Sequence, residues 1–165
     1  MGRFGIPGAA LLSFERADDI EYNRGDMSVE TFEFTVQSQG YCHLEDITGR
    51  VQDCLDRSAL LDGIACVAVT GSTAAISTME YEPGLLKDIP EMLEKLLPGD
   101  RSYHHDETWH DGNGFSHLRS FLIKTSHTVP FAGKKLMLGT WQQLVVADFD
   151  NRSRSRRIVV QLVGD

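Results

Sequence analysis

The chain has 165 residues, of which 41% are hydrophobic and 24% are charged, and these values are ordinary for a globular protein that buries one core. Its formal net charge of −8 argues against nucleic-acid binding, because proteins that bind the phosphate backbone usually carry a basic face. No apolar run approaches the ~20 residues that a membrane-spanning helix needs. Three cysteines without a Cys-x-x-Cys pair indicate free thiols in a reducing compartment, so we predict a cytoplasmic protein with no membrane partner.

The first 27 residues contain a glycine- and alanine-rich start and an acidic segment without a sustained period. We expect residues 1–27 to be a flexible or loosely docked extension. Residues 28–165 are predicted to form a single domain.

The first predicted elements are two strands and a helix. Phenylalanine and valine alternate with polar residues over 32–36, which predicts a half-buried strand, and a short second strand is expected over 41–44. From Ile47 to Leu61 the apolar residues recur every three to four positions. This spacing predicts a helix, with Asp46 as its cap.

A continuous apolar run over 64–69 predicts a strand that is covered on both faces. A Gly-Ser-Thr break separates it from a further strand over 74–79. An amphipathic stripe then predicts a helix over 85–97, with Pro90 in its first turn.

The region from 103 to 117 lacks apolar periodicity and is predicted to be a long loop. Three further strands are predicted, over residues 117–123, 136–148 and 156–163. This order describes an α+β domain with a largely antiparallel β-sheet and two helices packed on it.

The same loop is the main candidate for a functional site. The stretch from Tyr103 to Leu118 holds four of the six histidines and three acidic residues, the groups that a metal site or an acid–base site needs. A solvated polar loop is the alternative. We interpret His104 and His110 as solvated, and we expect His105 and His117 to meet if the loop folds back.

Three other segments carry polar groups with more than one interpretation. The Gly-Ser-Thr break at 71–73 offers backbone N–H groups and two hydroxyls for a phosphate or carboxylate oxygen, or is an ordinary tight turn. Gln142 is a candidate for binding a polar ligand. The basic run over 152–157 is interpreted as the guard of an edge strand, or as a phosphate contact in a neighbouring subunit.

In order and spacing, six segments of the chain resemble the YjbQ-like family, whose members are often described as secondary thiamine-phosphate synthases. The resemblance covers about Val29 to Gly164. The segments are Asp46-Ile47-Thr48, Gly71-Ser72-Thr73-Ala74, Glu80-Tyr81-Glu82-Pro83-Gly84, Tyr103-His104-His105-Asp106, Asn113-Gly114-Phe115-Ser116-His117-Leu118 and Leu138-Gly139-Thr140-Trp141-Gln142. It implies an α+β subunit in a compact homotrimer, with a polar pocket near the subunit contacts.

The resemblance also implies roles for individual residues. Catalytic roles fall to Glu80, His105, Asp106 and His117. Substrate or phosphate binding falls to Gly71, Ser72, Thr73, Asn113 and Gln142. A divalent metal, Mg²⁺ or Zn²⁺, would be held by His105, His117 and Glu80. The chain departs from the family at position 71, where many members have a histidine, so one imidazole is absent.

The reaction that this family suggests joins a hydroxymethylpyrimidine diphosphate to a thiazole phosphate and releases diphosphate, as a main or a side activity. Such chemistry needs cations or N–H donors on the leaving group, so the expected partner is a small phosphorylated substrate. The alternative is a metal- or anion-binding homotrimeric module without catalysis. The catalytic hypothesis requires that His105, His117 and Glu80 meet in one cleft.

Overall fold

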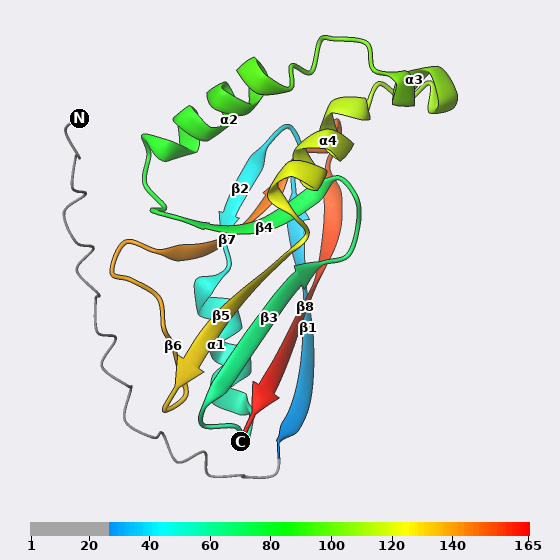
Figure 1. Cartoon of the computed structure of the whole chain (residues 1–165). Coiled ribbons are helices and arrows are strands. Elements are labelled where there is room, and N and C mark those ends of the chain that lie inside the picture. The colour runs from blue at the N-terminus through cyan, green and yellow to red at the C-terminus, as the bar shows by residue number, and fades with distance from the viewer. Residues whose placement is uncertain (1–26) are drawn as a thin grey trace, which may run out of the picture.

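Two antiparallel sheets and four helices build the part of the chain that the structure, a computed structural model, describes, which is residues 27–165 (Figure 1). Apart from Met27, the predicted N-terminal extension lies outside the described residues. None of the described helices is both long and apolar enough to span a membrane.

The larger sheet has five strands in the order β1-β8-β3-β5-β6, and every neighbouring pair is antiparallel. Its strands are β1 (Ser28–Ser38), β8 (Arg154–Gly164), β3 (Gly63–Val69), β5 (Ser126–Ala132) and β6 (Lys135–Leu136). The register places Phe32 opposite Val160 and Ala65 opposite Leu162. The smaller sheet has the order β2-β7-β4, from β2 (His43–Asp46), β7 (Gln143–Asp148) and β4 (Ala74–Met79).

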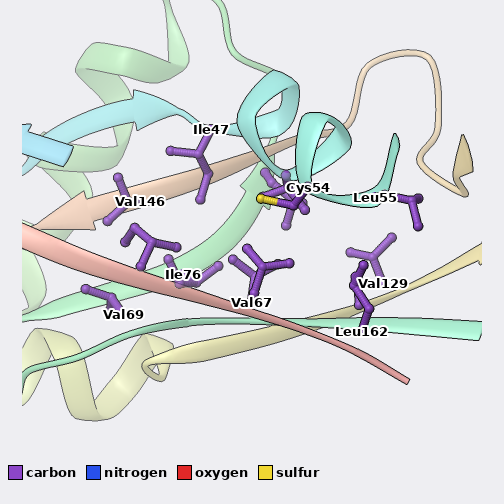
Figure 2. Close-up of a cluster of buried hydrophobic side chains, with 14 of the residues drawn as sticks. Ile47, Cys54, Leu55, Val67, Val69, Ile76, Val129, Val146 and Leu162 are labelled. Atoms are coloured by element: carbon purple, nitrogen blue, oxygen red, sulfur yellow. The ribbon is translucent and has the colours of Figure 1, made fainter. Parts of the chain in front are cut away.

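The main core lies between the two sheets. Alternate residues of the smaller sheet, such as Ile76 and Val146, pack against Val67 of the larger one (Figure 2). Helix α1 (Thr48–Arg57) adds the fully buried Leu55 to the same cluster. Truncating such a leucine to alanine typically costs about 2–5 kcal/mol of stability.

The other face of the smaller sheet is covered by two helices. Ala75 and Phe149 form a second buried cluster with Leu93 of α2 (Leu85–Leu96) and the partly buried Ile123 of α4 (Gly114–Ile123). Figure 1 shows both helices above β4. The predicted α+β class and the antiparallel pairing are therefore confirmed.

The region predicted as a loop and a strand is instead helical. Helix α3 (His104–Trp109) and helix α4 replace the loop over 103–117, and the predicted strand over 117–123 is wrong. The reason is that the buried face of α4 is polar. The hydroxyl of Ser120 donates to the backbone oxygen of Ala74 at 2.7 Å, so a hydrophobic period could not reveal this face.

Three other predicted details differ in the structure. The strand over 136–148 is interrupted: β6 ends at Leu136, and β7 begins only after a turn that Gln142 N–H closes on Gly139 O at 3.0 Å. Pro90 lies five residues after Leu85, beyond the first turn, because the Glu82 carboxylate accepts the Leu85 N–H and starts the helix early. The first helix ends at Arg57 and not at Leu61.

The basic run at the start of β8 does not guard a sheet edge. Strand β8 pairs with β1 along its whole length and with β3 from Ile158 onward. Residues 154–157 pair with β1 alone, but β8 is an inner strand of the sheet and Arg156 is buried against Asp148, so the edge-strand interpretation is wrong.

Candidate functional site

His105 and His117 lie in contact although twelve residues separate them. Their ring centroids are 4.3 Å apart and their planes are tilted by 41°. His105 belongs to α3 and His117 to the first turns of α4, and the short connection between the helices passes through His110 and Gly112, both with positive φ. The chain therefore folds back here as the catalytic hypothesis requires.

Asp106 holds this connection in place. One carboxylate oxygen accepts a hydrogen bond from Gly114 N–H at 3.0 Å and the other accepts one from Tyr103 N–H at 3.1 Å. Burial raises the pKa of Asp106, but the backbone N–H groups of Tyr103, Gly114 and Asn113 outweigh burial and hold it below its usual value. Asp106 is thus an ionised anchor of the α3–α4 connection, and these contacts do not support a direct part in proton transfer.

The surroundings of His117 change its pKa. Burial and, second, the neighbouring His105 ring lower the pKa of His117 below its usual value. Three carboxylates oppose this shift without reversing it, namely those of Asp111, Asp150 and Asp106. His117 is therefore a neutral imidazole at pH 7, the form that can accept a proton.

His105 contributes an imidazole nitrogen with an unmet hydrogen bond. Its Nε2 is buried and has no hydrogen-bond partner among the described residues. The nearest carboxylate oxygen in an ion-pair arrangement is Asp111 Oδ1 at 3.6 Å. Such a nitrogen is available to a ligand, a water molecule or a cation.

His117 lines two pockets, so it stands at the wall between them. One pocket has a volume of ≈ 310 Å³ and the other of ≈ 420 Å³. The smaller is lined by Gly71, Ser72, His117, Ser120, Phe121, Lys124 and Thr125. The larger is lined by Leu97, Arg101, Tyr103, His104, His105, Gly114, His117 and Leu118. Both pockets have a mixed lining: the smaller combines hydroxyl and ammonium groups with Phe121, and the larger combines Arg101 and three imidazoles with aromatic and aliphatic side chains.

Of the two hydroxyl groups in the predicted phosphate-binding turn at 71–73, one is free to bind a ligand and the other is already hydrogen-bonded within the protein. Ser72 is exposed and lines the smaller pocket. The Thr73 hydroxyl is buried, donating to Asp150 Oδ2 at 2.9 Å and accepting from Arg156 Nη2 at 2.7 Å. Ser72 can therefore meet a ligand, whereas Thr73 belongs to an internal network.

Sequence patterns indicated Arg156 only as part of the basic run over 152–157 and did not predict its buried ion pairs. Its guanidinium donates to both carboxylate oxygens of Asp148, at 2.7 and 2.6 Å, and to Asp150 at 3.4 Å. A signal was present, because Arg156 lies in phase with the buried Ile158 and Val160 on one face of the strand. A charged residue at a core position implies a buried partner.

Asn113 also has a structural position. It is buried just before α4, and its side-chain oxygen accepts a hydrogen bond from Ser116 Oγ at 2.6 Å and from Asn151 N–H at 3.3 Å. These bonds link the start of α4 to the turn after β7. They do not support the predicted substrate contact.

Glu80 and Gln142 lie away from His105 and His117. Thr73 precedes β4 and Glu80 follows it, so the strand separates them by roughly 20 Å. Gln142 Nε2 donates to Thr78 Oγ1 at 3.2 Å, near the Glu80 end, and neither residue lines a pocket that contains His117. The single cleft that the catalytic hypothesis requires does not form within one subunit.

The predicted metal ligands fail the same geometric test. Within residues 27–165, no group of three or more histidine, cysteine, aspartate or glutamate side chains is placed to hold a metal ion. The two imidazoles do meet, but Glu80 does not join them. The donor set of one subunit therefore does not fit the predicted Mg²⁺ or Zn²⁺ site.

Comparison with known proteins decides the family. A family model described as UPF0047 protein YjbQ-like matches residues 32–165. The chain belongs to the YjbQ-like family. A UPF0047 protein of Methanothermobacter thermautotrophicus is 41% identical over 138 residues, which cover 84% of this chain and 94% of that protein. The UPF0047 protein YugU of Bacillus subtilis is 28% identical over 120 residues, 72% of this chain and 88% of the relative.

Solved structures of YjbQ-like proteins share the fold. A protein of unknown function from Sulfolobus solfataricus superposes with a TM-score of 0.79 at 30% identity, covering 84% of this chain and 99% of the other. A conserved protein from Clostridium acetobutylicum gives a TM-score of 0.72 at 30% identity, covering 79% and 98%. The match to the YjbQ-like family covers residues 32–165, which include all the residues that line the two pockets.

Proposed function

We propose that the protein is a small-molecule transferase of the secondary thiamine-phosphate synthase type. It joins a hydroxymethylpyrimidine diphosphate to a thiazole phosphate and releases diphosphate. The observation that carries the proposal is the contact between His105 and His117, whose ring centroids are 4.3 Å apart, because His117 lines two pockets. A paired acid–base group between two pockets suits a reaction that joins two substrates.

The pair supplies a proton to the leaving group. In the reaction the thiazole nitrogen forms a bond to the methylene carbon of the pyrimidine, the C–O bond breaks, and its electron pair leaves with diphosphate. A proton that the neutral His117 accepts is passed on to the departing oxygen and stabilises the leaving diphosphate, with the His105 ring in contact with His117.

The two pockets would divide the substrates between them. Ser72 and Lys124 in the smaller pocket offer a hydroxyl and an ammonium to a phosphorylated group. Tyr103 and Leu118 in the larger pocket offer an aromatic and an aliphatic surface to a heterocycle. Since one subunit does not provide a three-ligand metal set, we derive no step through a metal bound by these residues.

The proposal includes the homotrimer. Leu118, Phe121 and Leu122 form an exposed apolar face on α4, next to the histidine pockets, and Phe121 is 74% exposed. A face of this kind favours burial against another subunit. We propose that a neighbouring subunit covers this face and brings its own Glu80 and Gln142 to the His117 pockets.

The test is an assay of thiamine phosphate formation from the two phosphorylated substrates. His117→Gln and His105→Gln are expected to lower turnover by about 10²–10⁴-fold, while folding is retained. His127→Gln is the matched control, because His127 lies in β5 and lines neither of the two pockets. The proposal is wrong if the unmutated protein forms no product, or if both variants keep full turnover.

A second candidate function is metal or anion binding without catalysis. The observation in its favour is the buried Nε2 of His105, which lacks a hydrogen-bond partner in the described part of the chain. This alternative expects near-stoichiometric metal in the purified protein, measured by elemental analysis, and its loss in His117→Ala. Protein without metal and with turnover would contradict it.

A further inference from the structure

Arg156 is a buried cation with one end of its guanidinium unused. The side chain is 7% exposed. Its Nε and Nη2 donate to Asp148, Asp150 and Thr73, but Nη1 donates to none of the described residues. Nη1 is not among the buried polar atoms that lack a partner in the described part of the chain, so this end of the guanidinium reaches solvent and can donate to a ligand.

The idle nitrogen faces the turn that borders the smaller pocket. A Cβ atom added to Gly71 would lie 3.2 Å from Nη1, and Nη1 is the one nearby atom that it would meet within 4 Å. Gly71 also has φ +144°, a backbone conformation that other residues rarely adopt. The absent side chain therefore leaves Nη1 open at the Gly71–Ser72 edge of the pocket.

Three further groups surround the same space. Ser72 is exposed and donates no hydrogen bond to a described residue, and Lys124 and His117 line the pocket with it. A hydroxyl, an ammonium and an imidazole thus line one pocket, and the Nη1 of Arg156 lies next to Gly71 at its edge. Such a set matches the several oxygens of a phosphoryl group better than the two of a carboxylate.

We propose that Arg156 anchors an oxyanion subsite, completed by Ser72 and Lys124, that binds a phosphoryl group of the substrate. This inference rests on the proposed function and deepens it, because it assigns the phosphoryl group to the smaller pocket. It also gives a reason for Gly71, since a side chain there would stand between Nη1 and the ligand.

Arg156 and Lys124 have different roles in the subsite, because only the charge of Arg156 is compensated by carboxylates. The ion pairs of Asp148 and Asp150 with Arg154 and Arg156 form a set with no net charge. Arg156 therefore orients the bound ligand, because the two carboxylates fix the plane of its guanidinium group. Lys124 supplies the positive charge that no carboxylate of this set compensates. Arginine and lysine are not interchangeable at such a site, because lysine lacks the planar fork.

The test measures binding of inorganic diphosphate to the full chain by isothermal titration calorimetry, with malonate as a dicarboxylate comparison. Lys124→Gln and Arg156→Lys are expected to weaken diphosphate binding by roughly tenfold or more. Ser72→Asp places a carboxylate in the subsite and is expected to abolish binding. Arg157→Gln is the matched control, because Arg157 is 59% exposed on the opposite face of β8 and pairs with Glu33, so diphosphate binding should be unchanged.

Several outcomes would overturn the subsite. These are no diphosphate binding by the unmutated protein, equal binding by Ser72→Asp, or binding of malonate as tight as that of diphosphate. Should Arg156→Lys fail to fold, Ser72→Asp decides, because Ser72 is exposed and outside the buried network. Since the measurement is binding, diphosphate binding with this variant pattern but without thiamine phosphate formation would support the subsite and reject only the proposed reaction.

Discussion

Asp106 accepts a hydrogen bond from the backbone N–H of Gly114 at 3.0 Å, which joins the first turn of α3 to the first residue of α4. His105 precedes Asp106 in the chain, and His117 lies three residues after Gly114. The contact between the two imidazoles therefore depends on one carboxylate that does not itself belong to the pair.

The first prediction follows from this dependence. Asp106→Asn replaces one carboxylate oxygen by an amide that cannot accept a hydrogen bond, so one of the two backbone N–H groups loses its acceptor. We expect a melting temperature lower by a few degrees and a loss of turnover comparable to that of His105→Gln. Calorimetry and the product assay measure the two effects.

Glu107→Gln is the control for Asp106→Asn, because Glu107 is exposed, lies in the same helix and, among residues 27–165, forms an ion pair only with His104. It should change neither quantity. An Asp106→Asn variant with unchanged melting temperature and full turnover would contradict the anchoring role.

The second prediction concerns pH. Burial and the His105 ring lower the pKa of His117 below its ordinary value of 6.5, so between the folded and unfolded pKa values the unfolded chain binds more protons. Stability therefore rises with pH through that window and is complete above about pH 6.5. The free energy of unfolding, measured with urea, should fall between pH 7.5 and pH 5.5, and His117→Gln should reduce this fall. His104→Gln, which removes an exposed imidazole, should leave the slope as it is.

The third prediction concerns the buried ion pair. Asp148 is 1% exposed and binds Arg156 through both carboxylate oxygens. Asp148→Asn leaves part of the Arg156 charge uncompensated in the interior, so we expect a loss of about 3–5 kcal/mol of stability in urea denaturation. Glu33→Gln removes the exposed partner of Arg157 and should cost less than about 1 kcal/mol. Equal effects of the two substitutions would show that burial of the pair is energetically unimportant.

Much of the fold could be predicted because its buried faces are apolar. Apolar residues at every second position predicted the strand over 32–36. Apolar residues at every third or fourth position predicted α1 and α2, with errors at the ends of these helices. Helix α4 escaped the same reasoning because Ser116, Arg119 and Ser120 form its buried face and find hydrogen-bond partners in other segments. Polar residues can be buried when hydrogen bonds satisfy them, and a search for apolar periodicity does not find a helix face of this kind.

The site was predicted in part for equally specific reasons. The two histidines meet through the long-range bond of Asp106, which no local pattern indicates. The separation of Glu80 from the turn at 71–73 was already implicit in the predicted strand over 74–79, since six extended residues span roughly 20 Å. The burial of Arg156 could have been predicted, because Arg156 and Ile158 are two residues apart in β8 and so lie on the same face of the strand.

The last prediction tests whether Glu80 acts in a neighbouring subunit. In the proposed homotrimer, each pocket combines His117 of one chain with Glu80 of the next, so His117→Gln and Glu80→Gln should each abolish turnover. When the two inactive proteins are unfolded together and reassembled, some pockets receive His117 and Glu80 from different, intact sources. For random assembly in a cyclic trimer, about a quarter of the pockets regain both groups, and activity should recover to about that fraction. Light scattering should give three times the 18.4 kDa mass of the chain. A mixture without activity, or a monomeric mass, would contradict the shared site, because groups acting within one subunit cannot complement each other.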